Sequence, residues 1–565
     1  MNPINHAAQN ITDRLAWQTA NRDQAGIAQN LADGQDIPEV YGLGEAGLFD
    51  EFFCFLEEFG ITKLFGQLDP KSQKRQSPAV NFHAVIFIYL MRIVAGLKFF
   101  WHIDSVILHS QPLMRLVGFN GREVRDGTCA RGKKKTSAKP DDETQGAVNN
   151  IQDGKQPTKI RGPVCPEFIA SRVMSILAPT LEKVFNRTIA ILASRNFFPK
   201  KVHVLLDASE IESTEKCEGR GRVRKEKPPE LRLRKGRIRK VSEIVFGFKI
   251  WVVWNANSRL PLAIRFSTIE VNDLAFAREV IQQAIDNLGD HAKIASIAMD
   301  RGFMDGKLLW WLNSQNIIFF IPAKSNMEVY NDALSLVHDG RIDTREQTRM
   351  IGHGKNQTMV TDYWKVSGIE GLTSAGFYSS LASGSHENRN DFVANPINAV
   401  VVLDDPYKKN NPDSKTMVIL TNGPVDNPLR VYDGYDERSE IENSMFREAK
   451  QAWFIERPPR NTAAAFRAHA YLTILTMALT TAFREWMDLQ SRLESSGQDT
   501  GIRKFREKVK EENGNKLIIF DEDRYAIFDA YEVFILCGRN VRMPSGVPET
   551  ITREDILRKY GALLE

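Results

Sequence analysis

The sequence lacks the features that mark several classes of protein. Its five cysteines, among 565 residues, include no CxxC pair, which argues against a cysteine zinc site and for a reducing compartment. The first residues are polar and charged where a signal peptide has an apolar segment, so export is not expected. The longest apolar run, from Phe82 to Trp101, contains His83, Arg92 and Lys98 and is typical of a buried helix rather than a membrane span.

Charge is nearly balanced over the whole chain. Lys and Arg total 75 against 71 Asp and Glu, and the resulting net charge of +4 indicates nothing about partners. The balance breaks down locally in the segment 217–240, which has eleven Lys or Arg and three Glu, an excess of 11 − 3 = +8. Such a segment attracts a polyanion by releasing its counterions, but it can equally be a solvated loop. Its position favours the first interpretation, because it begins ten residues after Asp207, a candidate site residue.

Composition and periodicity divide the chain into six segments. We expect an all-α N-terminal domain (1–120), a flexible linker (121–162), the first part of an α/β core (163–322), a β-rich insertion (323–432), the second part of the core (433–490) and a helical C-terminal region of unknown role (491–565). The predicted core strands are 202–206, 244–253, 260–269, 294–299 and 317–321, with helices at 166–185, 274–288 and 306–313. Short strands are expected in the insertion at 358–366, 399–403 and 417–420.

Two aspartates follow apolar runs of the predicted core. Asp207 ends Val-Leu-Leu-Asp, and Asp300 ends Ile-Ala-Met-Asp. A single aspartate at a strand end is usually a turn residue. Because the carboxyl ends of strands form the binding crevice of an α/β sheet, however, two of them can meet there and bind a divalent cation through oxygen.

A third candidate element lies in the predicted helix near residue 436. Tyr435, Arg438 and Glu442 are spaced i, i+3 and i+7, so an aromatic ring, a cation and a carboxylate share one helical stripe. An exposed helix with salt bridges explains these residues equally well.

In this order the motifs resemble the DDE transposases of bacterial insertion sequences, in the branch with a Tyr-x2-Arg-x3-Glu-x6-Lys signature. The resemblance covers roughly residues 201–486 and includes Arg301-Gly302-Phe303 after the second aspartate. The spacings, 300 − 207 = 93 and 442 − 300 = 142, leave room for the β-rich insertion of that branch.

The resemblance implies an RNase H-like core in which Asp207, Asp300 and Glu442 are catalytic and bind two Mg²⁺ or Mn²⁺ ions. It also implies that Tyr435, Arg438 and Lys450 contact the phosphates of the transposon end. Further DNA contacts are expected from Arg301 and from the basic segment, with Arg232, Arg234, Lys235 and Arg237 as candidates.

Lys450 departs from the signature, because seven residues rather than six separate it from Glu442. A regular helix turns roughly 100° per residue, so Lys450 would lie about 80° from Glu442 around the helix axis. Either a single-turn bulge absorbs the extra residue, or another cation such as Arg447 takes the role.

The expected function is therefore DNA transposition: cleavage at transposon ends followed by strand transfer into target DNA. A nuclease that cuts without joining and a non-enzymatic DNA-binding protein derived from a transposase are the alternatives. Expected partners are the terminal inverted repeats, target DNA and a second copy of the chain, in the bacterial cytoplasm at the nucleoid and not at a membrane. The 1–120 domain is expected to recognise DNA ends, while Trp364 is interpreted as a packed strand residue rather than a base-stacking one.

Overall fold

The computed structural model describes residues 21–37, 39–70, 80–126, 163–226, 233–234, 237–238, 242–351, 357–377, 393–406, 416–487, 502–522, 524–544, 546–548 and 550–562. The chain divides into two compact units. We call them the terminal unit (Met1–Val184, Ala452–Arg460, Leu479–Glu565) and the central unit (Phe185–Gln451, Asn461–Ala478).

Five strands of the central unit form the part of its sheet that carries the predicted aspartates. They are β3 (Lys201–Ser213), β7 (Ser242–Asn255), β8 (Leu260–Thr268), β9 (Lys293–Met299) and β10 (Ile318–Pro322). Their order is β8-β7-β3-β9-β10, in which β7 is antiparallel to both its neighbours while β3, β9 and β10 are parallel to one another. Each of them matches a strand expected from an apolar run, so the α/β class of the core is confirmed.

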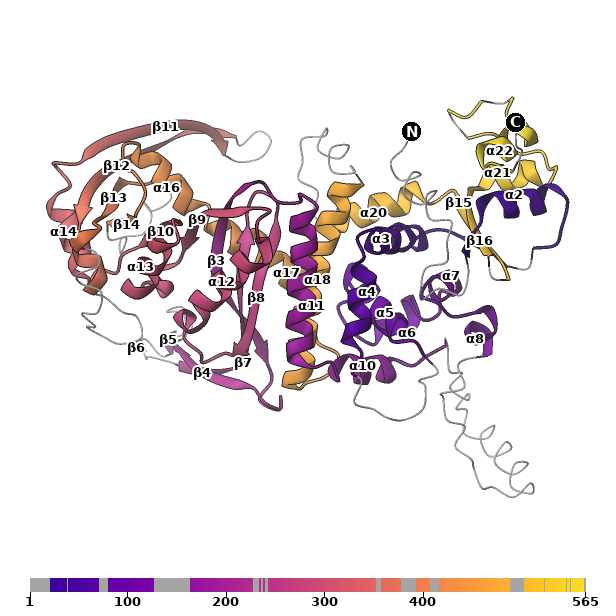
Figure 1. Ribbon diagram of the computed structural model, residues 1–565, viewed down its shortest axis with the longest axis horizontal. Coiled ribbons are helices and arrows are strands. Elements are labelled where there is room, and N and C mark those ends of the chain that lie inside the picture. Colours follow the sequence, from indigo (N-terminus) through magenta and orange to yellow (C-terminus); the bar gives the residue numbers. More distant parts are fainter. Residues whose placement is uncertain are drawn as a thin grey trace, which may run out of the picture. The chain divides into compact units, whose positions relative to one another are not determined.

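Helices cover both faces of this part of the sheet. On one face Trp251 meets Phe276 edge-on at 5.0 Å, where η3 (Asp273–Phe276) leads into α12 (Ala277–Leu288) beside β8 (Figure 1). On the other face Phe248 packs against Phe466 of α18 (Ala463–Trp486) at 4.9 Å. Alternate strand residues point to opposite faces, and a sheet covered on both sides needs apolar residues at nearly every position. This requirement explains the continuous apolar runs in the sequence.

The insertion continues the same sheet. β14 (Met417–Thr421) pairs antiparallel with β10 and is followed in space by β13 (Ile397–Asp404), β12 (Thr358–Leu372) and β11 (Arg341–Ile351). The insertion also contains α14 (Glu328–Ser335) and the start of α16 (Pro428–Asp436), which packs near these strands (Figure 1). Three of its four strands were expected. β11 was not, because its mostly polar sequence has no apolar alternation.

Further short elements complete the central unit. They are β4 (Gly221–Glu226), which pairs with β7, the two-stranded β5 (Leu233–Arg234) and β6 (Arg237–Ile238), η4 (Arg301–Phe303), α13 (Gly306–Ser314), η6 (Ser374–Phe377), the π-helix η7 (Ile441–Phe446) and α17 (Arg447–Gln451). The helix expected at 166–185 is instead two helices, α10 (Pro166–Met174) and α11 (Ala178–Ser194). Pro179, in the first turn of α11, explains the new start, since proline favours a first turn and disrupts a helix interior.

The terminal unit combines many helices with a sheet. The helices are α2 (Gln24–Ala32), α3 (Ala46–Glu58), α4 (Ile61–Phe65), η1 (Gly66–Leu68), α5 (Phe82–Val94), α6 (His102–Val106), α7 (Gln111–Leu116), α8 (Gly121–Asp126), α10, α20 (Ile502–Glu512), α21 (Ala530–Leu536) and α22 (Arg553–Lys559). In α5 every residue except His83 is buried, as expected for the apolar run. Among the described helices, none combines the length and apolar character needed to cross a bilayer.

The prediction of an all-α N-terminal domain and a helical C-terminal region was wrong. Strands from both ends form one sheet in the order β1-β16-β15-β2, built from β1 (Asn21–Arg22), β2 (Glu39–Gly42), β15 (Lys516–Asp521) and β16 (Arg524–Asp529). β15 and β16 pair with each other as a hairpin, whereas β1 and β2 are very short strands whose partners lie hundreds of residues away. In the predicted linker, residues 121–126 belong to α8 and the remaining residues lie outside the described ranges.

Candidate catalytic site

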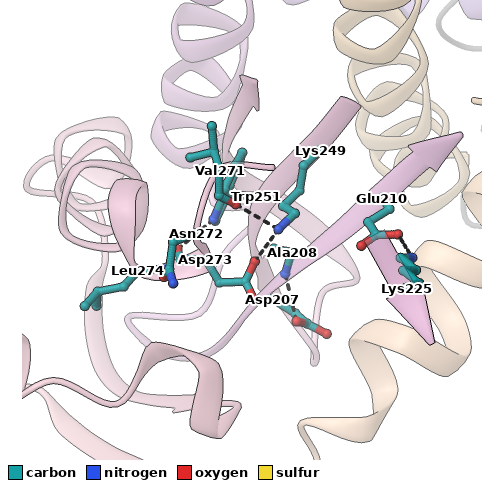
Figure 2. Close-up of polar contacts among 10 residues, drawn as sticks. All are labelled: Asp207, Ala208, Glu210, Lys225, Lys249, Trp251, Val271, Asn272, Asp273 and Leu274. Atoms are coloured by element: carbon teal, nitrogen blue, oxygen red, sulfur yellow. Dashed lines mark hydrogen bonds and ion pairs between the residues drawn. The ribbon is translucent and has the colours of Figure 1, made fainter. Parts of the chain in front are cut away.

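Asp207 lies within strand β3 rather than at its end. The parallel pairing of β3 with β9 stops at Leu206 and Met299, whereas the antiparallel pairing with β7 continues to Ser213. The expectation that Asp207 ends a strand was therefore wrong, because β7 supports β3 for six further residues. Asp207 is nevertheless the first residue of β3 beyond its partner β9. Its side chain is buried, and its Oδ1 accepts a hydrogen bond of 2.7 Å from the backbone N–H of Ala208 (Figure 2).

Asp300 directly follows β9, as expected. Leu206 of β3 is in register with Met299 of β9. The next residue on each chain segment is an aspartate, so Asp207 and Asp300 lie at the same level of the sheet. The Asp300 side chain caps the turn η4 by accepting a hydrogen bond of 2.7 Å from the backbone N–H of Arg301.

A half-buried ion pair lies next to the Asp300 turn. Lys249 of β7 donates to Asp273 Oδ1 at 2.8 Å and to the carbonyl of Val271 at 2.9 Å, while the Trp251 indole N–H donates to the Asp273 carbonyl at 2.8 Å (Figure 2). A Cβ on Gly302 would lie 3.1 Å from Asp273 Oδ2. Glycine thus allows η4 to approach η3 closely. Sequence reasoning missed this pair, because nothing links Lys249 to Asp273 until the strands are paired.

The third candidate element is not one regular helix. Tyr435 lies near the end of α16, Arg438 follows in a turn, and Glu442 is the second residue of the π-helix η7. The predicted stripe is still brought to the sheet. Arg438 Nη1 lies 3.4 Å from Asp207 Oδ2 and 3.1 Å from Glu442 Oε1, so one guanidinium group bridges the two carboxylates.

The electrostatics of the three carboxylates are coupled. Burial raises the pKa of Asp207 to about 7; Arg438 and the Ala208 N–H oppose this rise, and the charges of Glu442 and Asp300 add to it. Burial alone lowers the pKa of Arg438, yet the pKa is raised overall because Asp207, Asp300 and Glu442 outweigh that effect. All three carboxylates therefore act on one guanidinium group.

Tyr435 belongs to the same electrostatic group. Burial raises the pKa of its phenol to about 12, with Arg438 and Arg301 opposing the rise and Asp300 adding to it. The phenol is thus a neutral hydrogen-bonding group near physiological pH. Arg301, by contrast, is exposed.

The π-helix Ile441–Phe446 includes Glu442 and extends into the seven-residue gap before Lys450. A single-turn bulge, part of the first of the two alternatives, is therefore present, while the choice between Lys450 and Arg447 for the Lys position stays a prediction. If the bulge absorbs one residue, the remaining seven α-helical steps bring Lys450 to roughly 20° from Glu442 around the axis. Arg447 is exposed and donates to Asn443 Oδ1 at 2.9 Å.

The chemistry of the three side chains fits a divalent cation, since Mg²⁺ and Mn²⁺ prefer carboxylate oxygen. The described geometry is open: within the described residues, no three His, Cys, Asp or Glu side chains are close enough to hold a metal ion together. Arg438 lies between two of the carboxylates, where its positive charge offsets part of their repulsion. Gathering the carboxylates around a cation thus requires the Arg438 guanidinium to move aside.

Residues 198–479 match the family model described as the transposase DDE domain. This segment is similar to the transposase DDE domain. It begins just before β3, ends within α18 and contains all three candidate carboxylates. Among solved structures, the piggyBac transposase, seen by cryo-EM in a synaptic complex with hairpin DNA, is similar with 9% identity over 82% of this chain and 80% of that one, at a TM-score of 0.36. That TM-score is too low to establish a shared fold. No curated protein matches the chain.

The structure describes only part of the basic segment 217–240. Arg224 donates to Ser242 Oγ at 2.7 Å. Lys225 forms an ion pair with Glu210 of β3 (Figure 2). Both cations therefore have partners within the sheet. Arg234 and Arg237 are opposite each other in the backbone register of the short antiparallel strands β5 and β6. Arg232 and Lys235 lie outside the described residues.

Trp364 lies inside the insertion, as expected. It is 3% exposed and packs in a cluster with Val366, Val400 and Tyr432, among others. A base could stack on this ring only if the cluster opened, so the interpretation of Trp364 as a packed strand residue is confirmed.

Proposed function

We propose that the protein is a DNA transposase of the bacterial insertion-sequence branch. In this proposal it cleaves DNA at transposon ends and joins the freed 3′-hydroxyl to target DNA. The observation that carries the proposal is that Arg438 contacts both Asp207 and Glu442 and also feels the charge of Asp300, within a segment similar to the transposase DDE domain. Their positions in the sequence give no reason for them to meet unless the site is built for them.

The strand arrangement supports an RNase H-like core. Three antiparallel strands, β8, β7 and β3, are followed by β9 and β10, which run parallel to β3. Asp207 on the central strand and Asp300 after its parallel neighbour then lie where such a core presents its carboxylates. The insertion between β10 and α16 leaves this order intact.

Asp207, Asp300 and Glu442 are the residues that would hold two Mg²⁺ or Mn²⁺ ions. Bound there, the ions would supply activation of the attacking water and neutralisation of charge on the leaving oxygen. The chain itself contributes a buried carboxylate on a rigid strand and a cation, Arg438, that can pass from the carboxylates to a DNA phosphate. Tyr435, Lys450, Arg301 and the basic segment are placed along the DNA backbone in this proposal, and they give position rather than sequence specificity.

The terminal unit is proposed to recognise the transposon end. Two copies of the chain are proposed to hold two ends in a synaptic complex at the bacterial nucleoid.

Incubation with a labelled terminal inverted repeat, a target plasmid and Mg²⁺ tests this function. The repeat is taken from the DNA that flanks the coding sequence. We expect nicked ends and then joined product. Nicking without joined product would instead support a nuclease. Asp207→Ala should abolish cleavage and leave DNA binding intact. A wild-type chain that binds the repeat but never cuts it would indicate a non-enzymatic DNA-binding protein.

Metal binding can be tested without activity. Mn²⁺ titration followed by electron paramagnetic resonance should show binding to the wild-type chain and weaker binding to Asp207→Asn. Arg438→Gln should bind Mn²⁺ more tightly, because it removes the cation between the carboxylates. Equal binding by all three chains would place the metal elsewhere.

A further inference from the structure

The insertion and the motif helix α16 are joined by a bidentate ion pair. Arg345 of β11 donates through Nη1 to Asp433 Oδ1 at 2.8 Å and through Nη2 to Asp433 Oδ2 at 2.6 Å. Two parallel hydrogen bonds fix the orientation of the carboxylate as well as its distance.

Arg345 is itself held by the insertion. It stands opposite Trp364 in the register of β11 and β12, and its guanidinium carbon lies 5.8 Å from the centre of the Trp364 ring. A cation over an aromatic face is attracted by the ring quadrupole. The guanidinium is therefore supported by the buried ring while it holds Asp433.

The core side of α16 is also in close contact. Glu437 Oε2, just after the helix, lies 3.5 Å from His203 Nε2 on β3. A Cβ on Gly434 would lie 2.9 Å from the Phe320 ring of β10, so glycine permits the close packing there. The segment that ends in Arg438 is thus held by the core on one side and by Arg345 on the other.

We propose that Arg345 is a positioning residue that acts through Asp433: the insertion sets the orientation of α16 and thereby brings Arg438 and Glu442 to Asp207. The proposal rests on the transposase function proposed above. The Arg345 and Asp433 side chains are 34% and 47% exposed, and ion pairs this exposed contribute little to folding stability. Loss of the pair should therefore act on the geometry of the site more than on the stability of the fold.

The same hairpin offers a matched control. Arg349 of β11 pairs with Asp362 of β12, so this Arg–Asp pair stays within the hairpin. The Arg349 side chain is 44% exposed, comparable to Arg345. Replacing Arg349 removes a similar charge without touching α16. It differs in one respect, because its partner Asp362 is only 6% exposed whereas Asp433 is 47% exposed.

The experiment compares Arg345→Met, Asp433→Asn and Arg349→Met with the wild-type chain. Single-turnover cleavage of transposon-end DNA at saturating enzyme should slow about ten- to a hundredfold in the first two variants, a typical cost of a small misplacement in a catalytic site. Arg349→Met should cleave at the wild-type rate. The Kd for the same DNA should be unchanged in all three variants. The Tm should be unchanged in Arg345→Met and Asp433→Asn and lower in Arg349→Met, because the buried Asp362 carboxylate loses its cation. Arg345→Lys should restore little, because an ammonium group cannot form the two-pronged contact.

Hydrogen exchange provides a readout that needs no activity. Amides of residues 428–446 should exchange faster in Arg345→Met and Asp433→Asn and at the wild-type rate in Arg349→Met. The double variant Arg345→Asp/Asp433→Arg should restore part of the protection.

The outcomes separate the two proposals. A wild-type chain that never cuts transposon-end DNA overturns the transposase function, and hydrogen exchange alone then decides the role of Arg345. Wild-type cleavage together with full cleavage by Arg345→Met overturns the positioning role and leaves the function standing. The positioning role of Arg345 is also overturned if Arg349→Met slows cleavage equally. Unchanged hydrogen exchange of amides 428–446 in Arg345→Met has the same consequence.

Discussion

Two sides of the candidate site differ in how the fold supports them. Asp207 is buried in the middle of β3, with β7 beside it and the end of β9 next to it. Glu442 lies on a π-helix, its side chain is 55% exposed, and it forms an ion pair with Arg438. The strand side is fixed by backbone hydrogen bonds, whereas the helix side depends on side-chain contacts. The site therefore combines one rigid carboxylate with one that can be moved by its neighbours.

The largest expected effect comes from neutralising either carboxylate. Asp207→Asn and Glu442→Gln should each reduce cleavage by about a thousandfold or more, because a lost metal ligand removes several kcal/mol of transition-state stabilisation. The two variants should differ in Tm at neutral pH. Asp207→Asn should be stabilised by removal of a buried charge, and Glu442→Gln should be unchanged. Equal shifts in Tm would break the contrast between a buried and an exposed carboxylate.

Changes in the length of the helix that carries Glu442 should have an intermediate effect on the cleavage rate. Deleting Asn443 should convert the π-helix into a regular helix and keep Lys450 facing the same way, so cleavage should fall only slightly. Inserting an alanine after Asn443 should rotate Lys450 by about 100° and slow cleavage by about tenfold or more. Cleavage rates of the two variants, measured at equal DNA occupancy, give the comparison. Equal losses would show that the orientation of Lys450 is unimportant.

The pH dependence of folding stability tests the burial of Asp207 on β3. In the folded chain the pKa of Asp207 is about 7, above its ordinary value of 3.8, so the folded state retains a proton that the unfolded state releases. The stability that this proton contributes is fully present below the pKa of Asp207 in the unfolded state. It is lost as the pH rises through the pKa of Asp207 in the folded state. In metal-free protein, the Tm of the wild type should fall relative to Asp207→Asn between about pH 4 and pH 8. Parallel Tm curves for the two chains would contradict this.

The smallest expected effect concerns the Asp300 turn. Gly302→Ala places a Cβ 3.1 Å from Asp273 Oδ2, a tight contact that the side chain can relieve by a small shift. Cleavage should slow severalfold while Asp300 itself is kept. Adding Asp273→Ala removes the contact, so the two substitutions should not be additive in a double-mutant cycle. Additive losses would show that η3 and η4 act separately.

The sequence indicated the parts of the fold that have a local signal. Apolar runs predicted β8, β9 and β10 within one or two residues, because strands buried on both faces need apolar side chains along their length. β11 has no such signal, since its polar residues lie at a sheet edge. β1 and β2 were missed because they are short and their partners lie at the distant end of the chain.

The same distinction applies to the candidate site. Asp300 was predicted from its strand, and the extra residue before Lys450 predicted the π-helix as one of two alternatives. The position of Arg438 between two carboxylates was not predictable, because it depends on how α16 packs against β3. Lys249, Asp273 and Arg345 lacked any motif and emerged only from the paired strands.

The terminal sheet has a consequence for the order of events on the ribosome. Gln24 hydrogen-bonds with the backbone of Ile527, 503 residues later, and β1 and β2 have no sheet partner until β15 and β16 have been synthesised. Residues 198–479 can emerge and fold well before that point. A nascent chain can therefore contain a folded 198–479 segment while the sheet of the terminal unit is still incomplete. Assembly of that sheet is therefore a late step of folding, because β1 and β2 wait for β16 and β15 to be synthesised.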